Sequence, residues 1–79
     1  MDESGRNVLH ILADEYPKEQ KRVREVLSIY ESMRDAAQIN VASVILMITS
    51  VLEEAERAAV AGDAVRMVHS FYALRSIKA

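Results

Sequence analysis

Cysteine is absent from this 79-residue sequence, and glycine, proline and aromatic residues are scarce. Without cysteine no disulfide can form, and a catalytic nucleophile would have to be Ser, Thr or Lys beside a base. Ser43, Thr49 and Ser50 stand in an apolar stretch with no base within sequence reach. The two glycines, Gly5 and Gly62, are too few for a glycine-rich phosphate loop. These absences predict that the protein is not an enzyme.

The sequence also lacks a large excess of one charge and a long apolar run. Ten basic residues against twelve acidic residues give a net charge of −2, with both signs mixed along the chain. A nucleic-acid-binding domain normally gathers basic charge on one face. No stretch approaches the roughly 18 apolar residues of a membrane-spanning helix, and the polar N-terminus MDESGRN is unlike a secretory signal. We therefore expect a cytoplasmic protein with no membrane partner.

Metal-ligating residues are present but are not arranged as a site. His10 and Asp14 are four residues apart on an expected helix, but two ligands do not hold a metal. Glu53, Glu54 and Glu56 cluster, yet the Glu-x-x-His spacing of di-iron bundles is absent. We therefore expect neither a metal nor a cofactor.

Apolar residues recur at three- and four-residue steps along the chain, and no alternating strand pattern occurs. Pro17 is expected to end a first helix and start a second, because proline disfavours helix for the preceding residue but suits a first helical turn. Gly62 is expected to stop a third helix, and Asp63 to cap a fourth. The four expected helices cover residues 4–15, 17–36, 41–61 and 64–78.

These helices predict a single all-α domain over residues 1–79, a small antiparallel helical hairpin or bundle of three to four helices. A disulfide-free domain of this size buries only about 60–65% of its unfolded surface and is often stabilised by oligomerisation. The apolar content of 51% is consistent with stabilisation by oligomerisation. We therefore expect the domain to be dimeric.

The last three expected helices carry apolar stripes wider than a surface helix needs. In the stretch INVASVILMITSVL (39–52), a helical wheel places Ser43 and Ser50 on a wet side and one apolar stripe toward the core. Met47 and Val51 lie beside that stripe and widen it, whereas Leu46 stands apart on the polar side. Either the short first helix covers the excess, or a second buried face serves a homodimer or partner. We favour the second interpretation, because contiguous apolar patches mark interaction sites.

The candidate interface consists of the side chains that widen the stripes, of Leu46 and Ile77 outside them, of two arginines as polar anchors, and of a tyrosine expected to be exposed at the proline turn. Tyrosine and arginine are favoured at interface hot spots, and methionine repacks easily. The candidate interface residues are Tyr16, Ile29, Met33, Arg34, Leu46, Met47, Val51, Met67, Phe71, Leu74, Arg75 and Ile77.

The C-terminal half contains the segment VLEEAERAAVAGDAVRMVHSFYALRSI (51–77). It combines an Ala/Glu-rich helix end, a Gly-Asp turn and a helix that ends in Leu-Arg-x-Ile. This pattern resembles short helical-hairpin proteins of temperate phages, among them host-takeover proteins such as quorum-sensing anti-activators and pilus-motor inhibitors. The resemblance implies a small helical homodimer that works by occupying a host protein, and it transfers no functional residue.

The sequence thus predicts a small protein–protein interaction module, a homodimer that acts as a stoichiometric inhibitor or regulator of a host protein. The alternative is a DNA-associated transcriptional regulator or an antitoxin-like protein. The sequence feature that supports DNA binding is the basic run at residues 18–24. Its charges are spread around the helix and diluted by Glu19 and Glu25. We therefore expect the partners to be proteins, with no nucleic acid bound.

Overall fold

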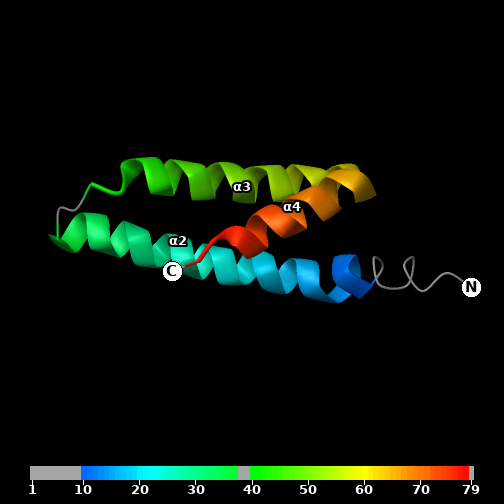
Figure 1. Ribbon diagram of the computed structural model, residues 1–79, viewed down its shortest axis with the longest axis horizontal. Coiled ribbons are helices and arrows are strands. Elements are labelled where there is room, and N and C mark those ends of the chain that lie inside the picture. The colour runs from blue at the N-terminus through cyan, green and yellow to red at the C-terminus, as the bar shows by residue number, and fades with distance from the viewer. Residues whose placement is uncertain (1–9, 38–39, 79) are drawn as a thin grey trace, which may run out of the picture.

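The computed structural model describes residues 10–37 and 40–78, and these residues form helices and short connections. A π-helical turn, η1 (Ile11–Glu15), runs directly into α2 (Tyr16–Ala37), which is followed by α3 (Ala42–Ala61) and α4 (Ala64–Ser76). Figure 1 shows α2 and α3 side by side and antiparallel, with α4 turning back from the end of α3 and crossing obliquely toward α2. The all-α class is confirmed, with three α-helices in the described residues. Within these ranges, no helix combines the length and apolar character needed to cross a membrane.

Pro17 lies inside a continuous helical segment, so the expected break between a first and a second helix is wrong for the described residues. In a regular α-helix, proline has no N–H to donate to the carbonyl of Ala13, and its ring crowds that carbonyl. The wider π-helical turn η1 precedes the proline at the point where this bond is missing. The chain therefore continues from η1 into α2 without a loop. Residues 4–9 of the expected first helix lie outside the described residues.

The junction between α3 and α4 agrees with the sequence prediction. Gly62 ends α3 with φ of 66°, a left-handed conformation that glycine adopts without a steric penalty. Asp63 then caps α4, because its side chain accepts a hydrogen bond from the backbone N–H of Arg66 at 3.2 Å. This two-residue turn places α4 back against the helix that precedes it.

The core lies where η1, α2, α3 and α4 meet, and it contains four residues that we expected at the interface. Tyr16 is only 2% exposed, and its hydroxyl donates a hydrogen bond to the carbonyl of Ala55 on α3 at 2.7 Å. Its predicted exposure was wrong because position 16 belongs to a continuous helix rather than to a turn. The other core side chains are Val23, Val26, Ile48, Ala55, Phe71, Leu74 and Ile77.

Phe71 and Leu74 were placed at the interface because the apolar arc of the last helix is wide, and Ile77 was added as an apolar residue outside that arc. The width has an intramolecular cause, since α4 packs against both α2 and α3 and so needs two apolar sides. Ile77 follows the helix in an extended conformation, which returns its side chain to the core. Met67, also predicted at the interface, is half-buried and packs against the same core.

Candidate protein-interaction site

α4 covers only part of the side of the α2–α3 hairpin on which it packs. It has 13 residues, against 22 in α2 and 20 in α3. At a rise of about 1.5 Å per residue, α4 spans roughly 20 Å of a hairpin about 30 Å long. Its C-terminal end lies beside the middle of α2 (Figure 1). Among the described residues, no third helix covers the end of the hairpin that is nearest the α2–α3 connection.

Two polar contacts show which side of each long helix faces α4. On α2, the Arg22 guanidinium donates to the backbone carbonyls of Leu74 and Ile77 at 2.9 and 2.8 Å. On α3, Glu54 accepts two hydrogen bonds from Arg66 of α4, at 2.8 and 2.9 Å. Side chains at steps of three, four, seven or eleven residues from Arg22 and Glu54 lie on these same sides of their helices.

On α2, the side that faces α4 continues as an apolar stripe beyond the end of α4. Ile29 and Met33 follow Arg22 by seven and eleven residues, so they lie two and three turns further along that side. They are 50% and 38% exposed, which is high for large apolar side chains. Both residues were predicted at the interface.

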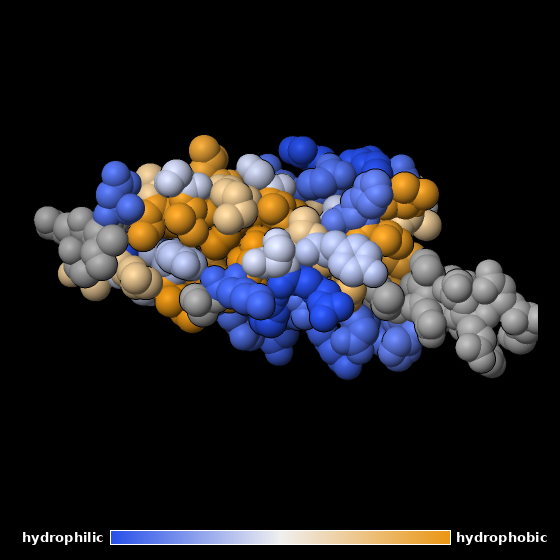
Figure 2. All heavy atoms as spheres, viewed as in Figure 1, coloured by the Kyte–Doolittle hydropathy of each residue, from blue (hydrophilic) through white to orange (hydrophobic). Residues whose placement is uncertain are grey.

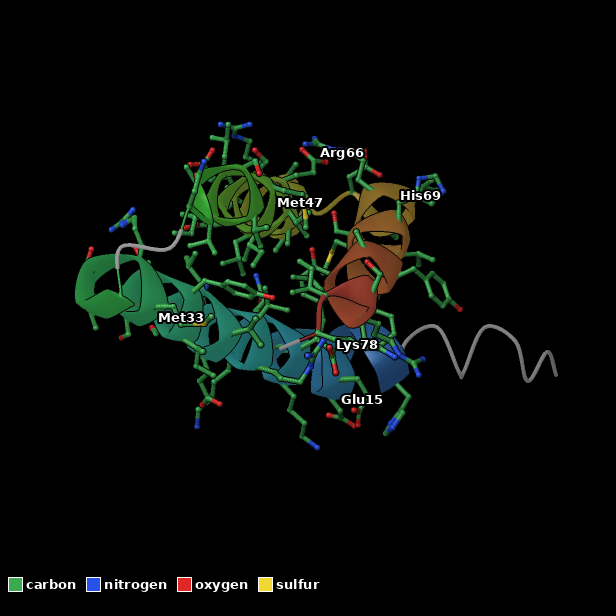
Figure 3. All side chains as sticks on the ribbon, turned by 60° about the vertical axis from the view of Figure 1, so that its left-hand side comes forward. Glu15, Met33, Met47, Arg66, His69 and Lys78 are labelled. Atoms are coloured by element: carbon green, nitrogen blue, oxygen red, sulfur yellow. The ribbon has the colours of Figure 1, made fainter. Side chains whose placement is uncertain are left out.

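On α3, the corresponding stripe leads back from Glu54 toward the start of the helix. Val51 and Met47 precede Glu54 by three and seven residues, and Val44 precedes Met47 by three. Met47 is 49% exposed, whereas the two valines are half-buried and pack against the core. Figure 3 labels Met33 on α2 and Met47 on α3, the two helices that border this uncovered surface.

We call this surface the open face and define it by five residues: Ile29, Met33, Val44, Met47 and Val51. Figure 2 shows apolar side chains gathered over the half of the molecule that contains the end of α2 and the start of α3. The structure thus brings together four of the twelve residues predicted for an interface, and adds Val44.

Leu46 and the two arginines of the prediction do not belong to the open face. Leu46 is 69% exposed but lies about 100° around α3 from Met47. The guanidinium of Arg34 contacts its neighbour Asp35 at 3.1 Å. Arg75 lies over the Phe71 ring, 5.8 Å from its centroid and one turn away on the same helix. Three further exposed apolar residues, Val60, Val65 and Tyr72, were not among the predicted interface residues.

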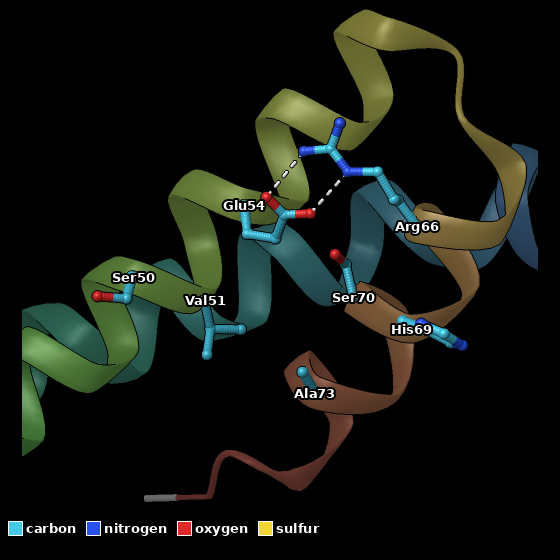
Figure 4. Close-up of a pocket in the computed structure, with 7 residues that line it drawn as sticks. All are labelled: Ser50, Val51, Glu54, Arg66, His69, Ser70 and Ala73. Carbon is cyan, nitrogen blue, oxygen red and sulfur yellow. Dashed lines mark hydrogen bonds and ion pairs between the residues drawn. The ribbon is translucent and has the colours of Figure 1, made fainter.

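A hollow of about 330 Å³ lies next to the open face, where α3 and α4 diverge (Figure 4). Val51 belongs to both, so the hollow extends the open face toward the α3–α4 turn. The Glu54–Arg66 pair spans its rim, and the Ser70 hydroxyl points toward this pair. The residues that line the hollow are Ser50, Val51, Glu54, Arg66, His69, Ser70 and Ala73.

The electrostatics of the hollow are set by this ion pair and by the buried tyrosine beneath it. Hydrogen bonding from Arg66 lowers the pKa of the Glu54 carboxyl below its ordinary value, and the same contact raises the pKa of Arg66. Burial raises the pKa of the Tyr16 hydroxyl. Both members of the surface pair are therefore charged at neutral pH, and they neutralise each other.

The Glu54–Arg66 pair predicts a specific acid response. A carboxyl whose pKa is lowered in the folded state stabilises the fold above its unfolded pKa, and this contribution is lost as the pH falls through the lowered value. Between about pH 6 and about pH 3, the melting temperature of the wild type should therefore fall more than that of Glu54→Gln. Circular dichroism melts at each pH measure this difference. Glu53→Gln is the matched control, because Glu53 meets Arg57 only at 3.6 Å. If both variants reduced the acid-induced fall in melting temperature equally, a special role for Glu54 would be contradicted.

The basic run at the start of α2 forms no continuous positive face. Arg22 is held by Glu19 at 2.8 Å and by the carbonyls of Leu74 and Ile77. Lys18 lies 3.6 Å from Glu15. Two of the four basic side chains thus have acidic partners within the chain, which reduces the charge available to a phosphate backbone.

In the part of the chain that the structure describes, the potential metal ligand His10 contacts two carboxylates at the surface. The His10 ring lies 2.9 Å from Asp14 and 3.9 Å from Glu15, and both contacts are exposed. No group of three or more His, Asp or Glu side chains converges in the described ranges.

No protein-family model matches the chain, and neither the curated proteins nor the solved structures give a significant match. The likeness to phage helical-hairpin proteins therefore stays a prediction from sequence.

Proposed function

We propose that this protein is a small protein–protein interaction module that acts stoichiometrically, by occupying a surface of another protein as an inhibitor or regulator does. The observation that carries the proposal is the open face, where Ile29, Met33 and Met47 stand exposed at the uncovered end of the hairpin. Contiguous exposed apolar patches usually mark interaction sites. Ile29 and Met33 lie one turn apart on α2, and Met47 lies on the neighbouring helix α3. This spacing suits a helix or a helical hairpin as the bound element.

The size of the open face sets the strength of binding. Burying the exposed half of a large apolar side chain contributes about 1 kcal/mol to binding. The three exposed side chains of the open face therefore supply only a few kcal/mol. Association itself costs about 4–15 kcal/mol, so the partner's apolar area and rim contacts must supply the rest. We expect dissociation constants of about micromolar, appropriate to a regulator that works at comparable concentration to its target.

The particular class, a phage-type protein that binds a host protein, is supported by the sequence resemblance of residues 51–77. The rival function, a DNA-associated regulator, has less support because Arg22 and Lys18 are engaged within the chain. A gel shift with random duplex DNA at low salt separates the two, since clear binding would favour the rival.

Methionine methyl groups provide the direct test of the proposal. Met33 and Met47 belong to the open face, whereas Met67 packs against the core. In protein labelled at the methionine methyls, we expect the Met33 and Met47 signals to shift or broaden when the protein is concentrated or mixed with a bacterial host extract. The Met67 signal should change less. If Met33 and Met47 respond to neither condition, the open face is not an interaction surface.

A further inference from the structure

We propose that the open face is covered by the open face of a second copy, in an antiparallel two-fold arrangement. Two α2–α3 hairpins would then pack as a four-helix bundle, with one α4 at each end. This inference rests on the proposed function and names the partner of that face. It follows from the charge around the open face and from the position of α4.

The rim of the open face is nearly uncharged, which favours a second copy over a charged partner. The Glu54–Arg66 ion pair beside the open face is satisfied within the chain. A two-fold contact brings the same patch of both copies together, so like charges must not oppose each other there. A charged partner would need complementary charges that this rim does not offer. The exposed residues that border Ile29, Met33 and Met47 along the two helices are Glu25, Ser32, Ala36, Ser43 and Ser50, and of these only Glu25 is charged.

The position of α4 selects the antiparallel arrangement. α4 lies over one end of the hairpin, and the other end is uncovered (Figure 1). In a parallel pair, both α4 helices would come to the same end of the contact and hold the open faces apart. In an antiparallel pair, each α4 lies beyond the α2–α3 connection of the other copy. The two Glu25 side chains, one turn before Ile29, then lie at opposite ends of the contact.

The middle of the open face lies nearest the two-fold axis of such a pair. Met33 and Met47 occupy this middle, since Met33 lies four residues before the end of α2 and Met47 five residues after the start of the antiparallel α3. Methionine side chains adapt well to a contact with their own copies. The charge of a glutamate at either position would oppose the same charge on the partner, and burial would add to the cost.

The first test is the oligomeric state as a function of concentration. Sedimentation or light scattering should show the wild type passing from monomer to dimer between about 10 µM and about 1 mM. The double variant Met33→Glu with Met47→Glu should dimerise at least about tenfold more weakly, a shift of about 1.4 kcal/mol. Leu46→Glu, the matched control on the other side of α3, should dimerise as the wild type does. Circular dichroism checks the fold, and the milder pair Met33→Gln with Met47→Gln replaces any variant that unfolds.

The second test measures the orientation of the two copies in the dimer. Because the sequence has no cysteine, a single introduced cysteine is the only site that a thiol-reactive spin label modifies. A spin label on Ala61→Cys lies 14 residues from Met47 along α3, so two labels in an antiparallel dimer are separated by about 40 Å. In a parallel dimer they would lie at the same end, within about 25 Å. A label on Ser50→Cys, near the axis, should give a short distance in either case and serves as the control.

Several outcomes would overturn the inference. They are a wild type that stays monomeric at about 1 mM, a dimer that Leu46→Glu disrupts as strongly as the methionine pair, and a short distance between the Ala61→Cys labels. If the Met33 and Met47 methyl signals respond to a host extract but not to protein concentration, the open face takes another protein. In that case the proposed function stands and self-association fails.

Discussion

Replacing Tyr16 by alanine is expected to unfold a large fraction of the protein at room temperature. The ring is 2% exposed and lies in the core beside residues of α3 and α4. Removing a buried aromatic ring typically costs 3–5 kcal/mol, and a disulfide-free domain of this size has a total stability of only about 5 kcal/mol. Urea denaturation followed by circular dichroism measures the loss.

The Tyr16→Phe variant separates the hydroxyl from the ring. It keeps the packing but removes the donor to the Ala55 carbonyl, a bond of 2.7 Å, and should cost about 1–2 kcal/mol. Tyr72→Phe, at an exposed position, is the control and should change stability by less than about 0.5 kcal/mol. If Tyr16→Ala were as stable as the wild type, the side chain would be exposed, as the sequence alone suggested.

The ends of α3 and α4 could be predicted because their signals are local. A glycine that takes a positive φ and an aspartate that accepts from the N–H three residues later act within one turn of chain. The effect of Pro17 could not be predicted in the same way. Proline at this position suits both a new helix and a continuous one, and only packing of the surrounding segment decides between them.

The open face was partly predictable for a related reason. Periodicity shows that Ile29, Met33, Met47 and Val51 widen their stripes, and this depends only on helical geometry. It does not show how many neighbours a helix has. α4 uses its wide arc to contact two helices, so Phe71 and Leu74 are core residues. The length of α4 relative to α3 then decides which part of the widened stripes stays uncovered.

Replacing Arg22 by alanine is expected to loosen the C-terminal end of α4. The last carbonyls of a helix lack their usual partners within it, and Arg22 donates from α2 to the carbonyl of Leu74 in the last turn and to that of Ile77, which follows the helix. Hydrogen bonds to a charged group contribute about 1.5–3 kcal/mol, and the partial exposure of Arg22 places the expected loss near the lower value. Urea denaturation gives the overall loss, and amide hydrogen exchange locates it along the chain.

Hydrogen exchange distinguishes a local role of Arg22 from a general one. Exchange should accelerate most for the amides of the last turn of α4, because the bonds of Arg22 hold that turn against α2. Arg22→Lys should recover only part of the stability, since an ammonium group cannot span Glu19 and two carbonyls as the guanidinium fork does. Arg24→Ala, at an exposed position two residues away, should stay within about 0.5 kcal/mol of the wild type. Equal losses in Arg22→Ala and Arg24→Ala would mean that α4 ends where it does without help from α2.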